Sequence, residues 1–185
     1  MRVICGIDYS MTSPAICIHT GDTWDVKNCQ FYFRTTVKKN HVSLAQFEGY
    51  LAEPYKCEEE RFHNTAQWAA RIIENHHPDF AALEGYAMGA KGKVFHIGEN
   101  TGQLKHAMWR ANLPFIVPPP TVIKKFATGS GRADKHAMEA AFLEETGVSV
   151  RKILAQSEMQ MNPSSDIIDA YYMCKYAFHN QPKRK

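Results

Sequence analysis

Two predicted strands end in carboxylates. Asp8 follows an apolar run at residues 2–7, and Glu84 closes a second apolar run at residues 80–84. A carboxylate that follows a buried strand emerges at the edge of the sheet, although an aspartate in a turn or at a helix cap has the same pattern. If the two strands are adjacent and parallel, both carboxylates lie at one edge.

Two more acids lie on a helix predicted over residues 163–178. Asp166 and Asp169 are three residues apart and therefore share one helix face. Both are near the helix N-terminus, where the macrodipole favours negative charge, so capping is an alternative role for Asp166. Asp169 is flanked by apolar residues, and a charge in such surroundings needs a partner, which a cation would supply.

These four acids together predict a metal site. Carboxylate oxygens are the ligands that magnesium and similar hard cations prefer. Two such ions roughly 4 Å apart stabilise the attacking and leaving oxygens of a phosphoryl displacement. No Ser-His-Asp or Cys-His arrangement competes, because the histidines are scattered. We therefore expect a site for two Mg²⁺ ions, with Mn²⁺ as a substitute, whose catalytic and metal-binding residues are Asp8, Glu84, Asp166 and Asp169.

The elements that must position these acids follow an α/β order. Three short strands joined by tight turns predict an antiparallel meander, and alternating helices and strands follow it. This order fits a ribonuclease H-like mixed five-stranded sheet flanked by helices, in a single domain over residues 1–180 with a basic tail at 181–185. The strands are expected at 2–7, 13–19, 30–36, 80–84 and 115–117, and the helices at 61–76, 96–111, 121–126, 133–146 and 163–178.

Several segments resemble motifs of the RuvC-type Holliday junction resolvases and occur in family order. They are GIDYS at 6–10, ALEG at 82–85, GENTGQL at 98–104, VPPPTVIK at 117–124, TGSGRADK at 128–135 and SSDIIDA at 164–170. The resemblance implies a homodimer that resolves four-way DNA junctions in recombination and repair. It also implies paired symmetric nicks with 5′-phosphate and 3′-hydroxyl ends. Residues 38–60 depart from the family pattern and look like an insertion.

Basic and aromatic side chains near the acids are the candidate DNA contacts. Lysines and an arginine on loops beside the acids could meet phosphates and give salt-sensitive affinity, although solvated surface residues are the alternative. Tyr86 and Phe95 offer flat surfaces on which an unpaired base could stack, unless they pack against the sheet. The candidates are Tyr86, Lys91, Lys93, Phe95, Lys124, Lys125, Arg132 and Lys135.

The family resemblance places a dimer interface on the helix predicted at residues 96–111. Leu104 and Met108 recur there at helical spacing, together with Ala107 and Ala111. We expect Leu104 and Met108 at a two-fold interface, because symmetric nicks need two equivalent sites. Burial in the core of the same chain is the alternative.

The composition of the 185 residues is that of a soluble globular protein, with 44% hydrophobic and 22% charged residues. The formal net charge of +3 neither demands nor excludes a nucleic-acid partner. Five widely spaced cysteines without a CxxC motif indicate reduced thiols. With no membrane-spanning run and no signal-peptide pattern, we expect an intracellular protein, cytoplasmic or, for a phage protein, in the host cytoplasm.

Three other functions fit parts of the pattern. A sugar kinase or actin-like ATPase also begins with a strand and a Gly-x-Asp turn. Those folds need two such domains and a phosphate-binding glycine loop, which this sequence lacks. A catalytically inactive junction-binding protein would not need all four acids. A nuclease of the same fold that cuts flaps or other branched DNA stays open.

Overall fold

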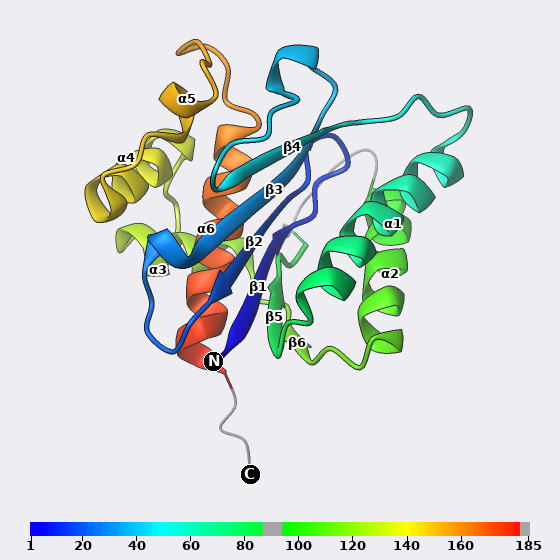
Figure 1. The fold of residues 1–185 in the computed structure, drawn as a ribbon, viewed down its shortest axis with the longest axis horizontal. Helices are drawn as coiled ribbons and strands as arrows, with labels where there is room; N and C mark the ends of the chain where they lie inside the picture. The colour runs from blue at the N-terminus through cyan, green and yellow to red at the C-terminus, as the bar shows by residue number, and fades with distance from the viewer. Residues whose placement is uncertain (87–93, 182–185) are drawn as a thin grey trace.

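A computed structural model describes residues 1–86 and 94–181. The candidate contacts Lys91 and Lys93 and the predicted basic tail beyond Gln181 lie outside the described residues. One mixed sheet has the strand order β4-β3-β2-β1-β5-β6 (Figure 1). Its strands are β1 (Val3–Asp8), β2 (Ala15–Thr20), β3 (Cys29–Thr35), β4 (Phe47–Leu51), β5 (Phe80–Leu83) and β6 (Phe115–Ile116).

The predicted meander and the parallel strands are confirmed. β1, β2 and β3 pair antiparallel in turn, and β5 and β6 run parallel to β1. The predicted number of five strands is wrong, because β4 adds a sixth, parallel to β3, inside the segment at 38–60. Gly49 interrupts the alternating pattern of this short strand. A Cβ on Gly49 would overlap the Asn40 carbonyl oxygen, so close packing there favours glycine.

Helices cover both faces of the sheet (Figure 1). α1 and α2 pack on one face, and α3, α4, α5 and α6 pack on the other. The short helix α5 and the two 3₁₀ turns were not predicted. None of the helices within the described ranges is both long and apolar enough to cross a membrane. The helices are η1 (Val26–Asn28), η2 (Lys38–Asn40), α1 (Glu58–His76), α2 (Val94–Arg110), α3 (Pro120–Thr128), α4 (Lys135–Thr146), α5 (Val150–Ile153) and α6 (Ser164–Asn180).

Side chains of the strands alternate between two cores. In β1, Ile4 belongs to the core under α6, whereas Cys5 and Ile7 belong to the core under α1 and α2. The same alternation in β5 sends Ala82 toward α6 and Leu83 toward α2. All five cysteines except Cys57 are buried.

Helix α6 packs tightly against β1 at Gly6. A Cβ on Gly6 would overlap backbone atoms of Ala170 and Cys174. Only glycine therefore lets α6 lie this close to β1. Gly6 precedes Asp8 by two residues and Ala170 directly follows Asp169, so this contact determines how near those two acids lie.

Candidate active site

Asp8 and Glu84 leave neighbouring parallel strands on the same face of the sheet. Ile7 and Leu83 are register partners, and the backbone N–H of Glu84 donates to the Ile7 carbonyl at 3.0 Å. Strand alternation places Asp8 with Ile4, and Glu84 with Ala82, on the face that α6 covers. The predicted juxtaposition of the two strand-end carboxylates is therefore what the structure contains.

Asp166 and Asp169, in the first turns of α6, lie at the same site as Asp8 and Glu84. Asp166 is buried, and its Oδ2 accepts a hydrogen bond of 2.7 Å from the Ser13 hydroxyl. The N-cap of α6 is Pro163, and no side chain caps this helix end. Asp166 is therefore not the N-cap residue, although it lies in the first turn of α6, where the helix dipole favours its negative charge.

Burial raises the proton affinity of all four carboxyl groups, and neighbouring carboxylates raise it further for Asp8, Glu84 and Asp169. Burial, and then the charges of Glu84, Asp166 and Asp169, raise the pKa of Asp8 well above its ordinary value. Burial, followed by the charge of Asp166, also raises the pKa of Glu84. Burial raises the pKa of Asp166 to about 6, although hydrogen bonds from Ser13 and Asp8 and the charge of Lys135 oppose that rise. Burial and the charges of Glu84 and Asp166 raise the pKa of Asp169 to about 7. The site thus holds more buried negative charge than its surroundings neutralise.

The donor set fits a hard divalent cation. Four buried or half-buried carboxylates supply only oxygen ligands, as magnesium and manganese require. Within residues 1–86 and 94–181, no three acidic, histidine or cysteine groups already stand in a metal-binding arrangement.

Two of the predicted DNA-contacting lysines lie beside the acids. A pocket of about 260 Å³ is lined by Glu84, Lys124, Lys135 and Asp169, among others. The charge of Lys135 acts on all four acids, and that of Lys124 on Glu84 and Asp169. Lys125 and Arg132 are exposed and do not line this pocket.

A hydrogen-bond network that the sequence did not predict holds Asp166. Asn162 Nδ2 donates to the Ser13 hydroxyl at 2.8 Å, and Ser13 donates to Asp166. Lys135 Nζ donates to Asn162 Oδ1 at 3.0 Å and to the Ser165 hydroxyl at 3.1 Å. Ser13 was expected only as the start of a strand. Ser13 stands between Thr12 and Pro14, and no local pattern marks it.

The two aromatic candidates are exposed. Tyr86 is 48% exposed, with Lys105 Nζ 4.9 Å from its ring centroid. Phe95 is 83% exposed and belongs to the first turn of α2, not to the preceding loop as expected. The alternative that the ring packs against the sheet is therefore wrong for Phe95, whereas about half of the Tyr86 surface is covered.

Leu104 and Met108 are core residues. Neither has exposed surface, and both belong to the core that Trp68, Ala69 and Leu83 share. The prediction that they lie at a dimer interface is wrong, because the apolar face of α2 packs against its own chain. The exposed side of α2 carries Phe95 and Trp109 instead, the latter 71% exposed.

Sequence comparison identifies bacterial relatives over half of the chain. No family model matches. The crossover junction endodeoxyribonuclease RuvC of Synechococcus sp. strain CC9311 is 30% identical over 93 residues, which cover 50% of this chain and 58% of the relative. RuvC of Synechococcus sp. strain RCC307 is 29% identical over 94 residues, which cover 51% of this chain and 60% of the relative. The matched segment thus spans about three fifths of each relative.

Solved structures match nearly the whole chain. Thermus thermophilus RuvC in complex with a Holliday junction substrate superposes with a TM-score of 0.65 and 16% identity, covering 97% of this chain and 94% of that one. The Fowlpox virus resolvase in its Holliday junction complex gives 0.53 and 16% identity, covering 98% and 100%. The fold is therefore ribonuclease H-like. The resemblance to RuvC-type Holliday junction resolvases, first seen in the motifs, is confirmed in sequence and in fold.

Proposed function

We propose that this protein is a divalent-metal-dependent endonuclease that resolves four-way DNA junctions by paired symmetric nicks. The observation that carries the proposal is the convergence of Asp8, Glu84, Asp166 and Asp169 from three segments onto one end of the sheet. The RuvC relatives and the two junction-bound structures support the substrate. Residues 1–180 form the nuclease domain in this proposal, and residues 181–185 form a basic tail.

The acids, the lysines and the residues around Asp166 have different roles in this proposal. Mg²⁺ or Mn²⁺, held by the four carboxylates, would polarise the scissile phosphate and lower the pKa of the attacking water. Lys124 and Lys135 line the pocket and attract the phosphate backbone into it. Ser13 and Asn162 orient the Asp166 carboxylate by hydrogen bonds.

Paired nicks need two equivalent sites, so the proposal includes a two-fold dimer. Phe95 and Trp109 are large, exposed and apolar on the outer side of α2. A Cβ on Gly98 or Gly102 would meet open space, so a second helix can approach closely there. Trp109→Glu should shift sedimentation of an active dimer toward monomer. An active, fully monomeric wild-type protein at micromolar concentration would contradict this part.

The decisive test is cleavage of a four-way junction, a flap and a linear duplex, with and without Mg²⁺. We expect cation-dependent, symmetric nicks in the junction only. Asp8→Asn, Glu84→Gln, Asp166→Asn and Asp169→Asn should each reduce cleavage by about three orders of magnitude while keeping junction binding. Glu144→Gln, on the exposed side of α4, is the matched control and should cleave normally.

The other outcomes identify the alternatives. Equal cleavage of flaps would indicate a nuclease for branched DNA in general. Junction binding without cleavage under any divalent cation would indicate an inactive junction-binding protein. Full activity of a folded variant at one of the four acids would show that this residue does not belong to the active site.

A further inference from the structure

A buried arginine lies at the same end of the sheet as the acids, on the opposite face. Phe33 of β3 belongs to the core under α6, so its neighbour Arg34 faces α1. Arg34 is only 6% exposed. Its Nη1 donates to the Thr65 hydroxyl of α1 at 2.8 Å, and that hydroxyl donates to the Arg61 carbonyl.

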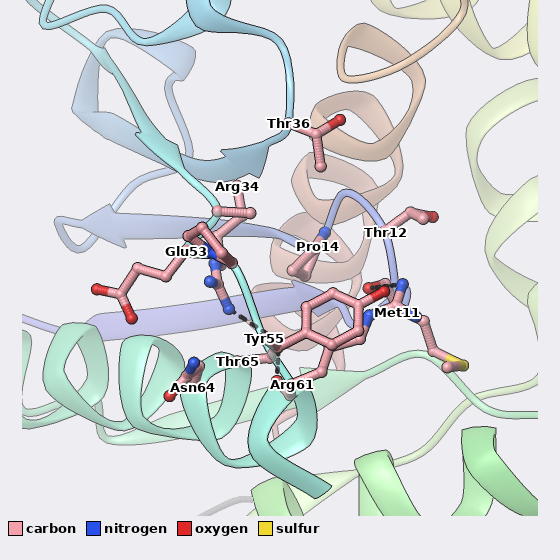
Figure 2. Close-up of a pocket in the computed structure, with 12 residues that line it drawn as sticks. Met11, Thr12, Pro14, Arg34, Thr36, Glu53, Tyr55, Arg61, Asn64 and Thr65 are labelled. Carbon is pink, nitrogen blue, oxygen red and sulfur yellow. Dashed lines mark hydrogen bonds between the residues drawn. The ribbon is translucent and has the colours of Figure 1, made fainter. Parts of the chain in front are cut away.

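The charge of Arg34 has no carboxylate partner in the described ranges 1–86 and 94–181. None of the ion pairs there includes it. Glu53 acts on it as a charge at longer range, and Figure 2 shows the Glu53 carboxylate extending away from the guanidinium. A guanidinium keeps its charge at physiological pH. Because a buried charge without a counter-ion is unfavourable, an anion from outside the chain would complete this arrangement.

Arg34 lines a pocket of about 270 Å³ between the β1–β2 turn, the segment after β4, and α1 (Figure 2). We call it the Arg34 pocket; its polar lining includes Thr12, Arg34, Thr36, Glu53, Arg61 and Asn64. The Arg61 guanidinium lies over the Tyr55 ring, with Cζ 5.2 Å from the centroid. Two guanidinium groups with hydroxyl and amide donors form the kind of surface that binds phosphate.

The β1–β2 turn separates the Arg34 pocket from the acids. Arg61 Nη2 donates to the Met11 carbonyl at 2.8 Å, which ties the turn to the pocket. Two residues further on, Ser13 donates to Asp166 on the other side. A phosphate in the pocket and a phosphate at the acids would therefore lie on either side of one short turn.

We propose that the Arg34 pocket binds a second backbone phosphate of the DNA substrate, on an arm away from the cleaved bond. This inference rests on the proposed function, which makes DNA the source of the phosphate. Inorganic phosphate has the same chemistry, so the test includes both sources. Arg34 supplies the unpaired positive charge, Arg61 adds a guanidinium that also pairs with Glu58 at 3.3 Å, and Glu53 opposes the charge.

The first experiment compares junction affinity by fluorescence anisotropy over a range of NaCl concentrations without divalent cation. Arg34→Met should bind about tenfold more weakly at low salt, because a charged hydrogen-bonding partner is lost. The slope of log affinity against log salt should become shallower by about 0.9. Lys27→Met is the control, because exposed Lys27 lies in η1 at the opposite end of the sheet. It should change neither quantity.

The second variant should change junction affinity in the opposite direction. Glu53→Gln removes a negative charge from the lining of the pocket, so it should bind the junction more tightly than wild type. If Glu53 is only a structural counter-charge for Arg34, the variant should bind DNA normally and melt earlier, which would overturn the proposal. This variant decides the question if Arg34→Met does not fold.

The third measurement separates the sources of phosphate. Sodium phosphate, compared with NaCl at equal ionic strength, should raise the melting temperature of wild type but not of Arg34→Met. If that happens while wild type binds no DNA, the proposed function and the DNA assignment both fail. If wild type cleaves junctions while Arg34→Met matches it in affinity and salt slope, the proposed function stands and this inference fails.

Discussion

The acidic site and the Arg34 pocket lie at one end of the same sheet, and the buried charge is negative in the first and that of the Arg34 guanidinium in the second. Burial, and then the charges of Glu84 and Asp166, raise the pKa of Asp169 to about 7, so the acidic site takes up protons as pH falls. The guanidinium of Arg34 cannot release its proton in the same range. Of the two regions, only the acidic one therefore changes its charge with pH.

The largest expected effect comes from a substitution that disrupts the contact between α6 and β1 beside the acidic site. Gly6→Ala places a Cβ against the backbone of α6, which cannot move without displacing Asp166 and Asp169. We expect a loss of about 3 kcal/mol in the free energy of unfolding, measured by urea denaturation.

Gly98→Ala is the matched control for that variant. A Cβ on Gly98 meets open space within α2, so alanine should leave the stability unchanged or raise it by up to about 1 kcal/mol. A Gly6→Ala protein as stable as wild type would show that α6 is not held by this contact.

The next effect is on the pH dependence of stability. The folded pKa values of Asp166 and Asp169, about 6 and about 7, lie above the ordinary unfolded values near 4. Their favourable contribution is therefore complete below about pH 4 and is lost as pH rises through 6 to 7. Without divalent cation, the free energy of unfolding should fall by about 3 kcal/mol between pH 5 and pH 8.

Asp169→Asn tests the origin of that loss. The amide carries no charge, so this variant should be more stable than wild type at pH 8 and should lose less stability between pH 5 and pH 8. Glu144→Gln should follow the wild-type curve. Identical pH profiles for wild type and Asp169→Asn would contradict the buried charge cluster.

A smaller effect is expected from the residues that orient Asp166. Ser13→Ala removes the hydroxyl that donates to its carboxylate, and should lower junction cleavage about 10- to 100-fold. Weaker metal binding should explain the loss, so raising the Mg²⁺ concentration should restore part of the rate. Ser157→Ala, at an exposed position, is the control. Normal cleavage by Ser13→Ala would show that the hydrogen bond is not needed.

The convergence of the four acids could be predicted from the sequence because strand ends and helix faces are local features. Asp8 and Glu84 each follow an apolar strand, and the three-residue spacing of Asp166 and Asp169 determines a shared face. The meander followed from short strands and turns. These patterns need no knowledge of what packs against them.

The predictions from sequence that were wrong or missing concern tertiary packing. Helical spacing identified Leu104 and Met108 as an apolar face, but could not tell whether α1 or a second subunit covers it. Arg34 lies within the strand predicted at 30–36, but nothing in that segment shows that α1 covers its side chain. Gly49 weakened the pattern of β4, so the sixth strand was missed.

The central claim is that the four carboxylates form a divalent-cation site, and Mn²⁺ binding followed by electron paramagnetic resonance at pH 8 without DNA tests it most directly. Wild type and Glu144→Gln should bind Mn²⁺, and added Mg²⁺ should displace it. Asp169→Asn should lose most of that binding while remaining folded. Equal Mn²⁺ binding by wild type and Asp169→Asn, or none by folded wild type, would contradict the account.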